Sequence, residues 1–147
     1  MHRIRLTAPS DRPDFRQVPV FLWREGQNYD SDGDSFNPAS REWTELYLCN
    51  REDEKEILVI GPEESGDDIL TMFVESKTLE LAARAAFYLA TFMGGQVAVE
   101  PETHFSPPST LLPFLGKNFD PAAALARAQA SPFARSTLRS PYPNLDR

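Results

Sequence analysis

The 147-residue chain carries 22 acidic and 15 basic side chains, which give a net charge of −7, and it contains a single cysteine. One cysteine excludes an intrachain disulfide, and the acidic balance argues against a surface that binds nucleic-acid phosphates. No stretch approaches the ~20 apolar residues that a membrane span needs, and residues 1–5 are not followed by an apolar leader. We therefore expect one cytoplasmic domain that binds neither nucleic acid nor membrane.

The first 42 residues predict little regular structure. Residues 4–6 form at most a short strand, and a second strand is predicted over 18–23, where large apolar residues follow one another. Pro19 has no amide to donate, which would confine that second strand to a sheet edge or a bulge. Residues 24–42 are rich in Gly, Asn, Asp and Pro and predict a loop.

Part of this loop resembles half of a calcium-binding loop. Residues 28–33 place oxygen-bearing side chains at alternate positions and a glycine at the sixth. The twelfth position is Ala39 instead of a bidentate glutamate, and no helical pattern precedes the segment. We expect an Asp/Gly-rich turn with no metal and no other cofactor, and calcium binding is the alternative interpretation.

The middle of the chain predicts three strands, over residues 43–50, 56–60 and 68–75. They are joined by a charged turn at 51–55 and a loop at 61–67, connections short enough for an antiparallel meander. The unbroken apolar run of the second of these strands predicts burial on both of its faces.

A long helix is predicted over residues 77–93, with Ser76 as its cap and Gly94 as its end. Its apolar residues recur every three or four positions, so the helix should be buried against a sheet. Leu81, Ala85, Leu89 and Phe92 widen the apolar face, and the polar stripe comprises Lys77, Glu80, Arg84, Tyr88 and Thr91. A strand at 96–99 would complete a right-handed crossover with parallel flanking strands.

The last third of the chain is rich in proline. Residues 101–119 mix proline with leucine and phenylalanine, which predicts an irregular arm packed on the domain, with one helical turn near 109–115. Asp120 followed by proline is typical of a helix start, so a short helix is predicted over 122–130. Residues 131–147 predict an extended or disordered tail.

The predicted fold is a single α+β domain over residues 1–130. It combines a mainly antiparallel sheet, a β-β-β-α-β core over 18–100 and one long buried helix with the Pro-rich arm and a short C-terminal helix.

Few residues offer catalytic chemistry. The chain has two histidines, His2 and His104, and Cys49 lies within an apolar predicted strand, the usual setting of an inert thiol. These three residues are too few and too widely spaced for a zinc site. The adjacent carboxylates at 63–64 and 67–68 lie in hydrophilic runs, where burial would not raise their pKa. We expect no catalytic residues, and the alternative is a small hydrolase-type enzyme that uses a carboxylate or His104 in a groove between the arm and the sheet.

Acidic residues would gather at one end of the predicted sheet. If the three middle strands form a meander, the loop at 61–67 lies at the same end as the loop that enters Trp43. Arg24 and Arg41 flank the loop that enters Trp43, and no lysine or arginine is expected near the acids themselves. The meander therefore predicts an acidic rim that would steer a basic protein partner. The rim comprises Asp30, Asp32, Asp34, Glu63, Glu64, Asp67 and Asp68. A solvated sheet end is the alternative interpretation.

In size, acidity and β-β-β-α-β arrangement, residues 18–100 resemble the cytoplasmic immunity proteins that bacteria pair with polymorphic or secreted toxins. Residues 43–48 and 76–95 contribute most to this resemblance. It implies a non-catalytic protein that binds a cognate toxin with a basic surface and covers the active site of that toxin. A phage or secretion-system accessory, or a regulatory adaptor, is the alternative among interaction proteins.

Overall fold

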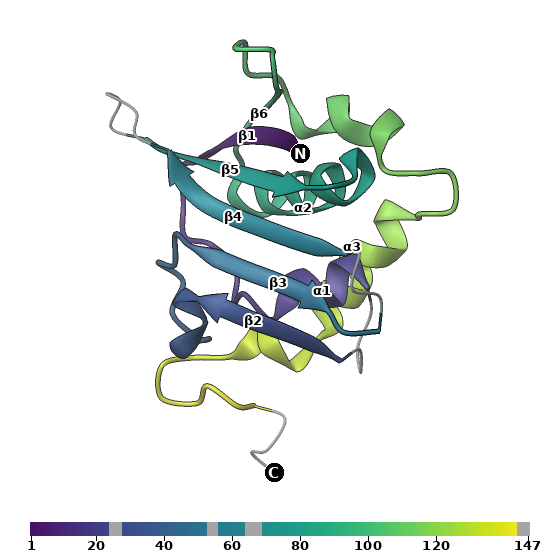
Figure 1. Ribbon diagram of the computed structural model, residues 1–147. Helices are drawn as coiled ribbons and strands as arrows, with labels where there is room; N and C mark the ends of the chain where they lie inside the picture. Colours follow the sequence, from purple (N-terminus) through teal and green to yellow (C-terminus); the bar gives the residue numbers. More distant parts are fainter. Residues whose placement is uncertain (24–27, 53–55, 64–68, 144–147) are drawn as a thin grey trace.

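The computed structural model describes residues 1–23, 28–52, 56–63 and 69–143, which form a six-stranded antiparallel sheet with helices packed on it (Figure 1). In sequence order the strands are β1 (His2–Ala8), β2 (Tyr29–Gly33), β3 (Leu46–Asn50), β4 (Ile57–Glu63), β5 (Leu70–Ser76) and β6 (Val97–Val99). The helices are α1 (Gln17–Leu22), α2 (Leu79–Met93) and α3 (Pro121–Ala130), with 3-10 helices η1 (Asp34–Phe36), η2 (Pro108–Phe114) and η3 (Pro132–Arg135). The predicted single α+β domain, with its antiparallel sheet, long helix and short C-terminal helix, is confirmed.

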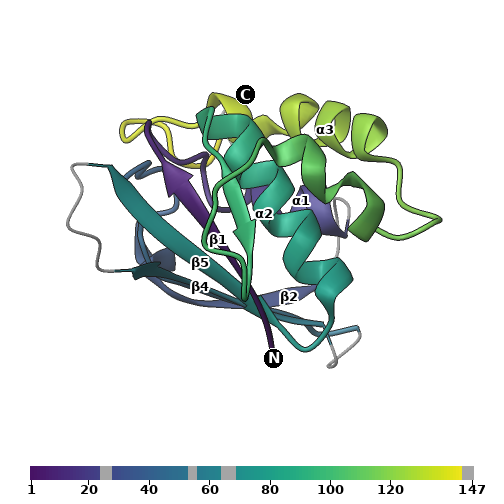
Figure 2. The same cartoon turned by 90° about the horizontal axis from the view of Figure 1, so that it is seen from above.

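The three α-helices lie on one side of the sheet, as the view from above shows (Figure 2). Helix α2 packs on β1, β5 and β6, and α1 packs against α2 and α3. The strand side chains that face these helices are buried: Ile4, Leu6, Leu46, Leu48, Leu58, Ile60, Met72 and Val74. Because successive strand residues point to opposite faces, their neighbours project from the other side, which we call the open face.

The meander of β3, β4 and β5 is confirmed, with β4 longer than predicted. Strand β4 continues through Gly61 and Pro62 and pairs Glu63 with Thr71 on β5. The prediction that this strand is buried on both faces is wrong, because Leu58 is buried whereas its neighbour Val59 is only half-buried. An antiparallel sheet covered on one side leaves such alternation.

Strand β1 lies between the two strands that flank α2. It pairs antiparallel with both, placing Ile4 opposite Val74 on β5 and opposite Val99 on β6. Strands β5 and β6 are therefore parallel to each other, as the predicted crossover requires, but they are not neighbours. Helix α2 crosses over β1 on its way from β5 to β6.

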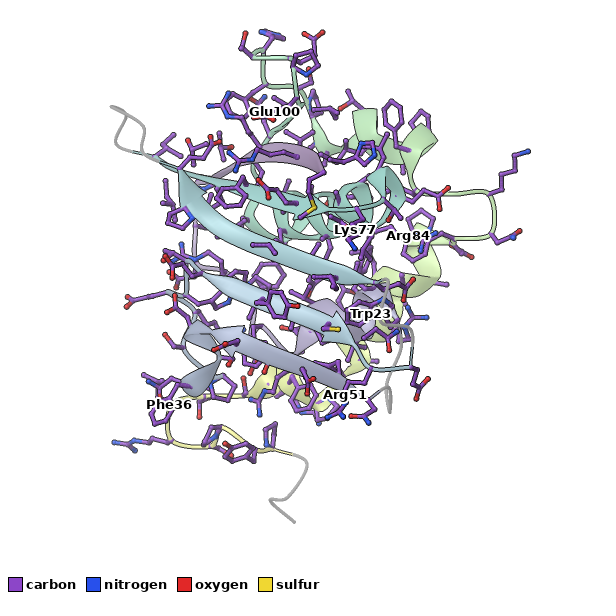
Figure 3. All side chains as sticks on the ribbon, in the orientation of Figure 1. Trp23, Phe36, Arg51, Lys77, Arg84 and Glu100 are labelled. Carbon is purple, nitrogen blue, oxygen red and sulfur yellow. The ribbon has the colours of Figure 1, made fainter. Side chains whose placement is uncertain are left out.

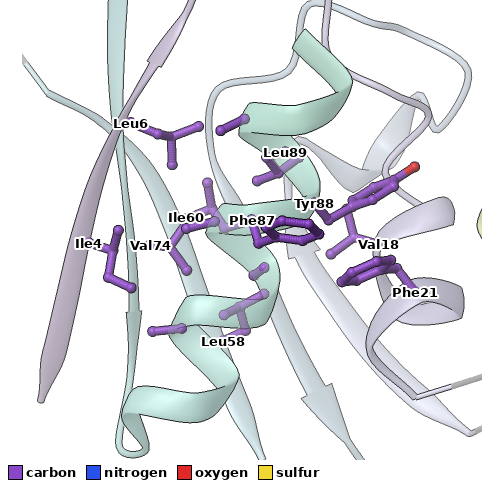
Figure 4. Close-up of a cluster of buried hydrophobic side chains, with 14 of the residues drawn as sticks. Ile4, Leu6, Val18, Phe21, Leu58, Ile60, Val74, Phe87, Tyr88 and Leu89 are labelled. Carbon is purple, nitrogen blue, oxygen red and sulfur yellow. The ribbon is translucent and has the colours of Figure 1, made fainter. Parts of the chain in front are cut away.

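Helix α2 is the centre of the core (Figure 4). It starts two residues later than predicted, because Thr78 caps it by accepting a hydrogen bond from the Leu81 amide at 3.3 Å. Gly94 ends it in the left-handed conformation, as predicted. Five alanines of the helix are fully buried, so α2 lies close to the sheet: Ala82, Ala83, Ala85, Ala86 and Ala90.

Two residues of α2 have exchanged the sides predicted for them. Tyr88, assigned to the polar stripe, is 1% exposed and stacks on Phe21 of α1 with 4.7 Å between ring centroids. Phe92, assigned to the apolar face, is 46% exposed. Helix α1 covers the side of α2 that carries Tyr88, which is why this residue of the predicted polar stripe is buried.

The strand predicted over 18–23 is wrong, because this segment forms helix α1. All six residues of α1 are buried, so the segment shows no polar side that would reveal a helical period. Pro19 lies in the first turn, where a backbone amide has no partner within the helix, and therefore does not break it.

The prediction of a loop over 24–42 is wrong for residues 29–33, which form the edge strand β2. Tyr29 pairs with Asn50 and Gly33 with Leu46 across from β3. An extended strand cannot wrap its oxygen atoms around one ion, which removes the geometry of a calcium loop. No group of three His, Cys, Asp or Glu among the described residues is arranged to hold a metal.

The arm and the last helix follow their predictions. The arm contains η2, which packs on α2 and buries Leu111. Asp120 caps α3 by accepting a hydrogen bond from the Ala123 amide at 3.1 Å, and Pro121 occupies the first position of the helix.

The described part of the predicted tail is folded onto the domain. Asp14 is fully buried, pairs with Arg16 at 2.6 Å and accepts a hydrogen bond from the Ser136 hydroxyl at 2.5 Å. Arg16 also donates to the carbonyl of Pro141. A buried carboxylate needs such partners, so this cluster fastens residues 136–141 to the segment before α1.

Candidate functional site: the open face of the sheet

The open face has a charged half over β1 and β5. Arg5 donates to Glu63 at 2.6 Å, and Arg3 donates to Glu75 at 2.5 Å and to Glu63 at 3.4 Å. The Arg3 guanidinium also lies over the Phe73 ring, 4.2 Å from its centroid. Two arginines and two glutamates therefore neutralise one another in this half.

The other half of the open face is an apolar groove over β3 and β4. The groove has a volume of about 390 Å³, and its lining includes Tyr47, Val59, Gly61, Pro62 and Phe73. Tyr47 is 38% exposed, and Val59 and Phe73 are half-buried. Figure 3 looks directly onto this face and its side chains. Apolar side chains are thus presented to solvent from three adjacent strands.

Gly61 shapes the floor of the groove. A Cβ atom at this position would lie 2.6 Å from Cζ of Phe73, closer than real atoms approach. The Phe73 ring therefore occupies the space that any other residue at position 61 would fill. A glycine in a strand interior commonly marks such a close approach.

Most described carboxylates of the predicted acidic rim already have a partner within the chain. The structure describes four of its members, whereas Glu64, Asp67 and Asp68 lie outside the described residues. Gly33 is opposite Leu46, and Leu46 is opposite Ile60, so residues 34 and 63 lie at the same end of the sheet with β3 between their strands. The prediction that no lysine or arginine is near is wrong, because Arg3 and Arg5 pair with Glu63, and Arg51 pairs with Asp30 at 3.4 Å.

The Asp34 carboxylate is hydrogen-bonded to the backbone. Its Oδ2 accepts hydrogen bonds from the amides of Thr44 at 2.9 Å and Glu45 at 3.0 Å. These two bonds favour the ionised carboxylate and lower the pKa of Asp34 below its usual range. The residue fixes the chain that enters β3.

Two carboxylates at the groove have no basic partner among the described residues. Asp32 is directly opposite Tyr47 in the β2–β3 register, and its Oδ1 accepts only from the Gly33 amide. Glu45 precedes Tyr47 by two residues, is exposed and lines the groove. The groove is therefore apolar along its length and negative beside Tyr47.

The groove itself was missed by the sequence interpretation. Its signal was the alternation along residues 45–50, where Glu45, Tyr47 and Cys49 take one side and leucines take the other. Reading 43–50 only as an apolar strand hid which residues would face solvent.

The residues considered for catalysis are not brought together. Cys49 lies on β3, whereas His104 is exposed on the arm beyond β6, so β4, β5, β1 and β6 lie between them. Neighbouring strands are ~4.8 Å apart, which separates the two residues by roughly 19 Å or more. A polar groove of about 500 Å³ does lie between β1 and the arm, but its lining includes His2, Glu100 and Glu102 and not His104.

In the described part of the chain, no helix has the length and apolar character needed to cross a membrane. A comparison with known protein families, curated proteins and solved structures found no match for this chain.

Proposed function

We propose that this chain is a non-catalytic protein-binding protein, and that a partner protein docks on the open face of the sheet. The observation that carries the proposal is the apolar groove lined by Tyr47, Val59 and Phe73 on a face that no described helix covers. Contiguous apolar surface on a folded protein is the usual mark of an interaction site. His104 does not line the groove between β1 and the arm, which supports a binding role over a hydrolase that uses this histidine.

The charge of the open face favours a basic partner. Its described charged side chains include five acids and three arginines, and each of these arginines is paired with a carboxylate: Asp30, Asp32, Glu45, Glu63 and Glu75 against Arg3, Arg5 and Arg51. The net charge of the whole chain, −7, has the same sign. Complementary charge speeds the encounter of two proteins and excludes acidic competitors.

Within this class we propose an immunity protein whose partner is a cognate toxin with a basic surface. The proposal draws on the general resemblance of residues 18–100 to immunity proteins and on the acidic open face. A regulatory adaptor or accessory protein would use the same face and differ only in what the partner does.

Site-specific crosslinking in the native host tests the docking face. Tyr47 is replaced by the photo-crosslinking residue p-benzoyl-phenylalanine, and the matched control carries it at Gln129, which is exposed on α3 at the helical side. We expect a protein adduct from position 47 and none from 129, and we expect Val59→Arg to weaken binding of the purified partner at least about tenfold. An adduct from position 129 alone, or full affinity of Val59→Arg, would contradict the proposal.

Growth experiments then separate the immunity protein from the adaptor. Expression of the crosslinked partner alone should arrest a heterologous bacterium, and co-expression of this chain should restore growth. A harmless partner would reject the immunity function and retain the docking face.

A further inference from the structure

We propose that the groove beside Tyr47 binds one arginine side chain of the partner. The inference rests on the proposed function and specifies the chemistry that the open face recognises. It follows from the shape of the groove, from the aromatic ring on its wall and from the two carboxylates that have no basic partner among the described residues.

The shape of the groove suits a long, partly apolar side chain. Tyr47, Val59 and Pro62 line it, and Gly61 contributes no side chain to its floor. Arginine and lysine bury their aliphatic stems along such surfaces while the charged group stays at the polar end. The polar end here is the side of Tyr47 where Asp32 and Glu45 lie.

The two carboxylates can reach the same cation. Directly opposed residues of an antiparallel pair have Cβ atoms ~5 Å apart, and residues two positions apart on one strand are separated by roughly 7 Å. Asp32 and Glu45 therefore flank the Tyr47 ring from the neighbouring strand and from the same strand. A guanidinium group has a planar fork of donors that can bridge two carboxylates, which an ammonium group matches less well.

The open face already contains an arginine held in this manner. Arg3 lies over the ring of Phe73 and pairs with Glu63 and Glu75. Tyr47, with Asp32 and Glu45, repeats this combination of an aromatic ring and two carboxylates on the other half of the face, without a cation among the described residues. An apolar side chain in the groove would remove both carboxylates from water and leave them unpaired, at a cost that an arginine avoids.

A pentapeptide pair tests the inference without knowledge of the partner. The probe is Ac-Gly-Val-Arg-Val-Gly-NH2, and its control replaces arginine by citrulline, which keeps the shape and removes the charge. Each is titrated into the ¹⁵N-labelled full chain while amide shifts are followed by NMR. We expect the arginine peptide to shift the amides of Tyr47, Val59 and Gly61, and to bind about three- to tenfold more tightly than the citrulline peptide at low salt.

Charge-removing variants sharpen the result. The double variant Asp32→Asn/Glu45→Gln should reduce arginine-peptide affinity to that of the citrulline peptide. The matched control Glu100→Gln/Glu102→Gln removes two exposed charges beyond β6 and should leave the affinity within about twofold. Unchanged shifts elsewhere in the spectrum show that each variant is folded.

The outcomes distinguish this inference from the proposed function. Equal affinity of the two peptides, or an unchanged affinity of Asp32→Asn/Glu45→Gln, would overturn the arginine site. If neither peptide shifts the three groove amides at millimolar concentration, the arginine site is again overturned. In each case the crosslink from position 47 still decides whether a partner docks on the open face.

Discussion

The covered and open faces of the sheet are built from neighbouring residues that experience opposite surroundings. On β4, Leu58 is fully buried beneath α2, whereas Val59 lines a groove on the solvent side. The covered face packs against the alanine-rich helix α2. The open face has a charged half, in which arginines and glutamates pair, and an apolar half beside two carboxylates that have no basic partner among the described residues. The difference teaches that stability and recognition are carried by alternate positions of the same strands, so single substitutions can separate them.

The largest expected effect is on the covered face. Leu58→Ala should lower the free energy of unfolding by about 2–5 kcal/mol, because it leaves a cavity under α2. Val59→Ala on the same strand should cost less than about 1 kcal/mol, since that side chain is only half-buried. Urea unfolding followed by circular dichroism measures both values. Similar losses for the two variants would mean that the open face is covered in solution.

Gly61→Ala should lower the free energy of unfolding by about 1–3 kcal/mol, because the new methyl group meets the Phe73 ring. The displaced ring should also distort the groove. Phe73→Ala supplies the control background, in which adding Gly61→Ala should cost less than about 1 kcal/mol. Additive losses in this double-mutant cycle would show that the two residues are not in contact.

Tyr88→Phe should raise the free energy of unfolding by about 1 kcal/mol at neutral pH, because no described residue is a hydrogen-bond partner for the buried Tyr88 hydroxyl. Burial raises the pKa of Tyr88 above its ordinary value of 10.0. As the pH rises above 10, the Tyr88 phenol ionises in the unfolded state before it ionises in the folded state. Ionisation of Tyr88 therefore leaves stability unchanged below pH 10 and lowers the free energy of unfolding as the pH rises above it. Thermal unfolding at pH 7 and pH 10.5 should show a smaller alkaline loss for Tyr88→Phe. An equal loss would assign the alkaline effect elsewhere, for example to Tyr29, whose pKa burial also raises.

Asp34→Ala should have the smallest effect, about 0.5–1 kcal/mol, because its two backbone hydrogen bonds are exposed. Its lowered pKa means that the contribution is present above the ordinary value of 3.8 and is lost as the pH falls below it. Urea unfolding at pH 6 and pH 3 should give a difference between wild type and variant at pH 6 that shrinks at pH 3. A constant difference would show that the carboxylate charge plays no part.

Helix α2 was predictable because its period, its glycine end and its length agree with one another. Helix α1 was not, since six buried residues show no period and Pro19 suggests a strand edge until its place in the first turn is known. Strand β2 was hidden for the opposite reason: its sequence of Asp, Ser and Gly favours a turn, and only pairing with β3 holds it extended. The insertion of β1 between β5 and β6 depends on contacts far apart in the chain, which local patterns do not encode.

The candidate site also has a part that the sequence predicts and a part that it does not. Strand order predicts that residues 30–34 and 63 lie at one end of the meander. The register confirms this for residues 33–34 and 63, whereas Asp30 is opposite Cys49, and therefore level with Ile57, toward the other end of the sheet. Which carboxylates stay unpaired depends on Arg3, Arg5 and Arg51. Arg3 and Arg5 come from β1, which lies outside the three-strand meander, and Arg51 reaches Asp30 on β2, which was predicted to be a loop. The groove depends on the close approach of Phe73 to Gly61, a side-chain contact that strand order alone does not specify.

The position of β1 also affects how the chain is made. Residues 2–8 are synthesised well before their partners, residues 70–76 and 97–99. Such high contact order delays closure of the sheet until nearly the whole core has been synthesised. During that interval the hydrogen-bonding edges of β1 and β5 are unpaired, so nascent chains on the same message are most prone to pair with one another then.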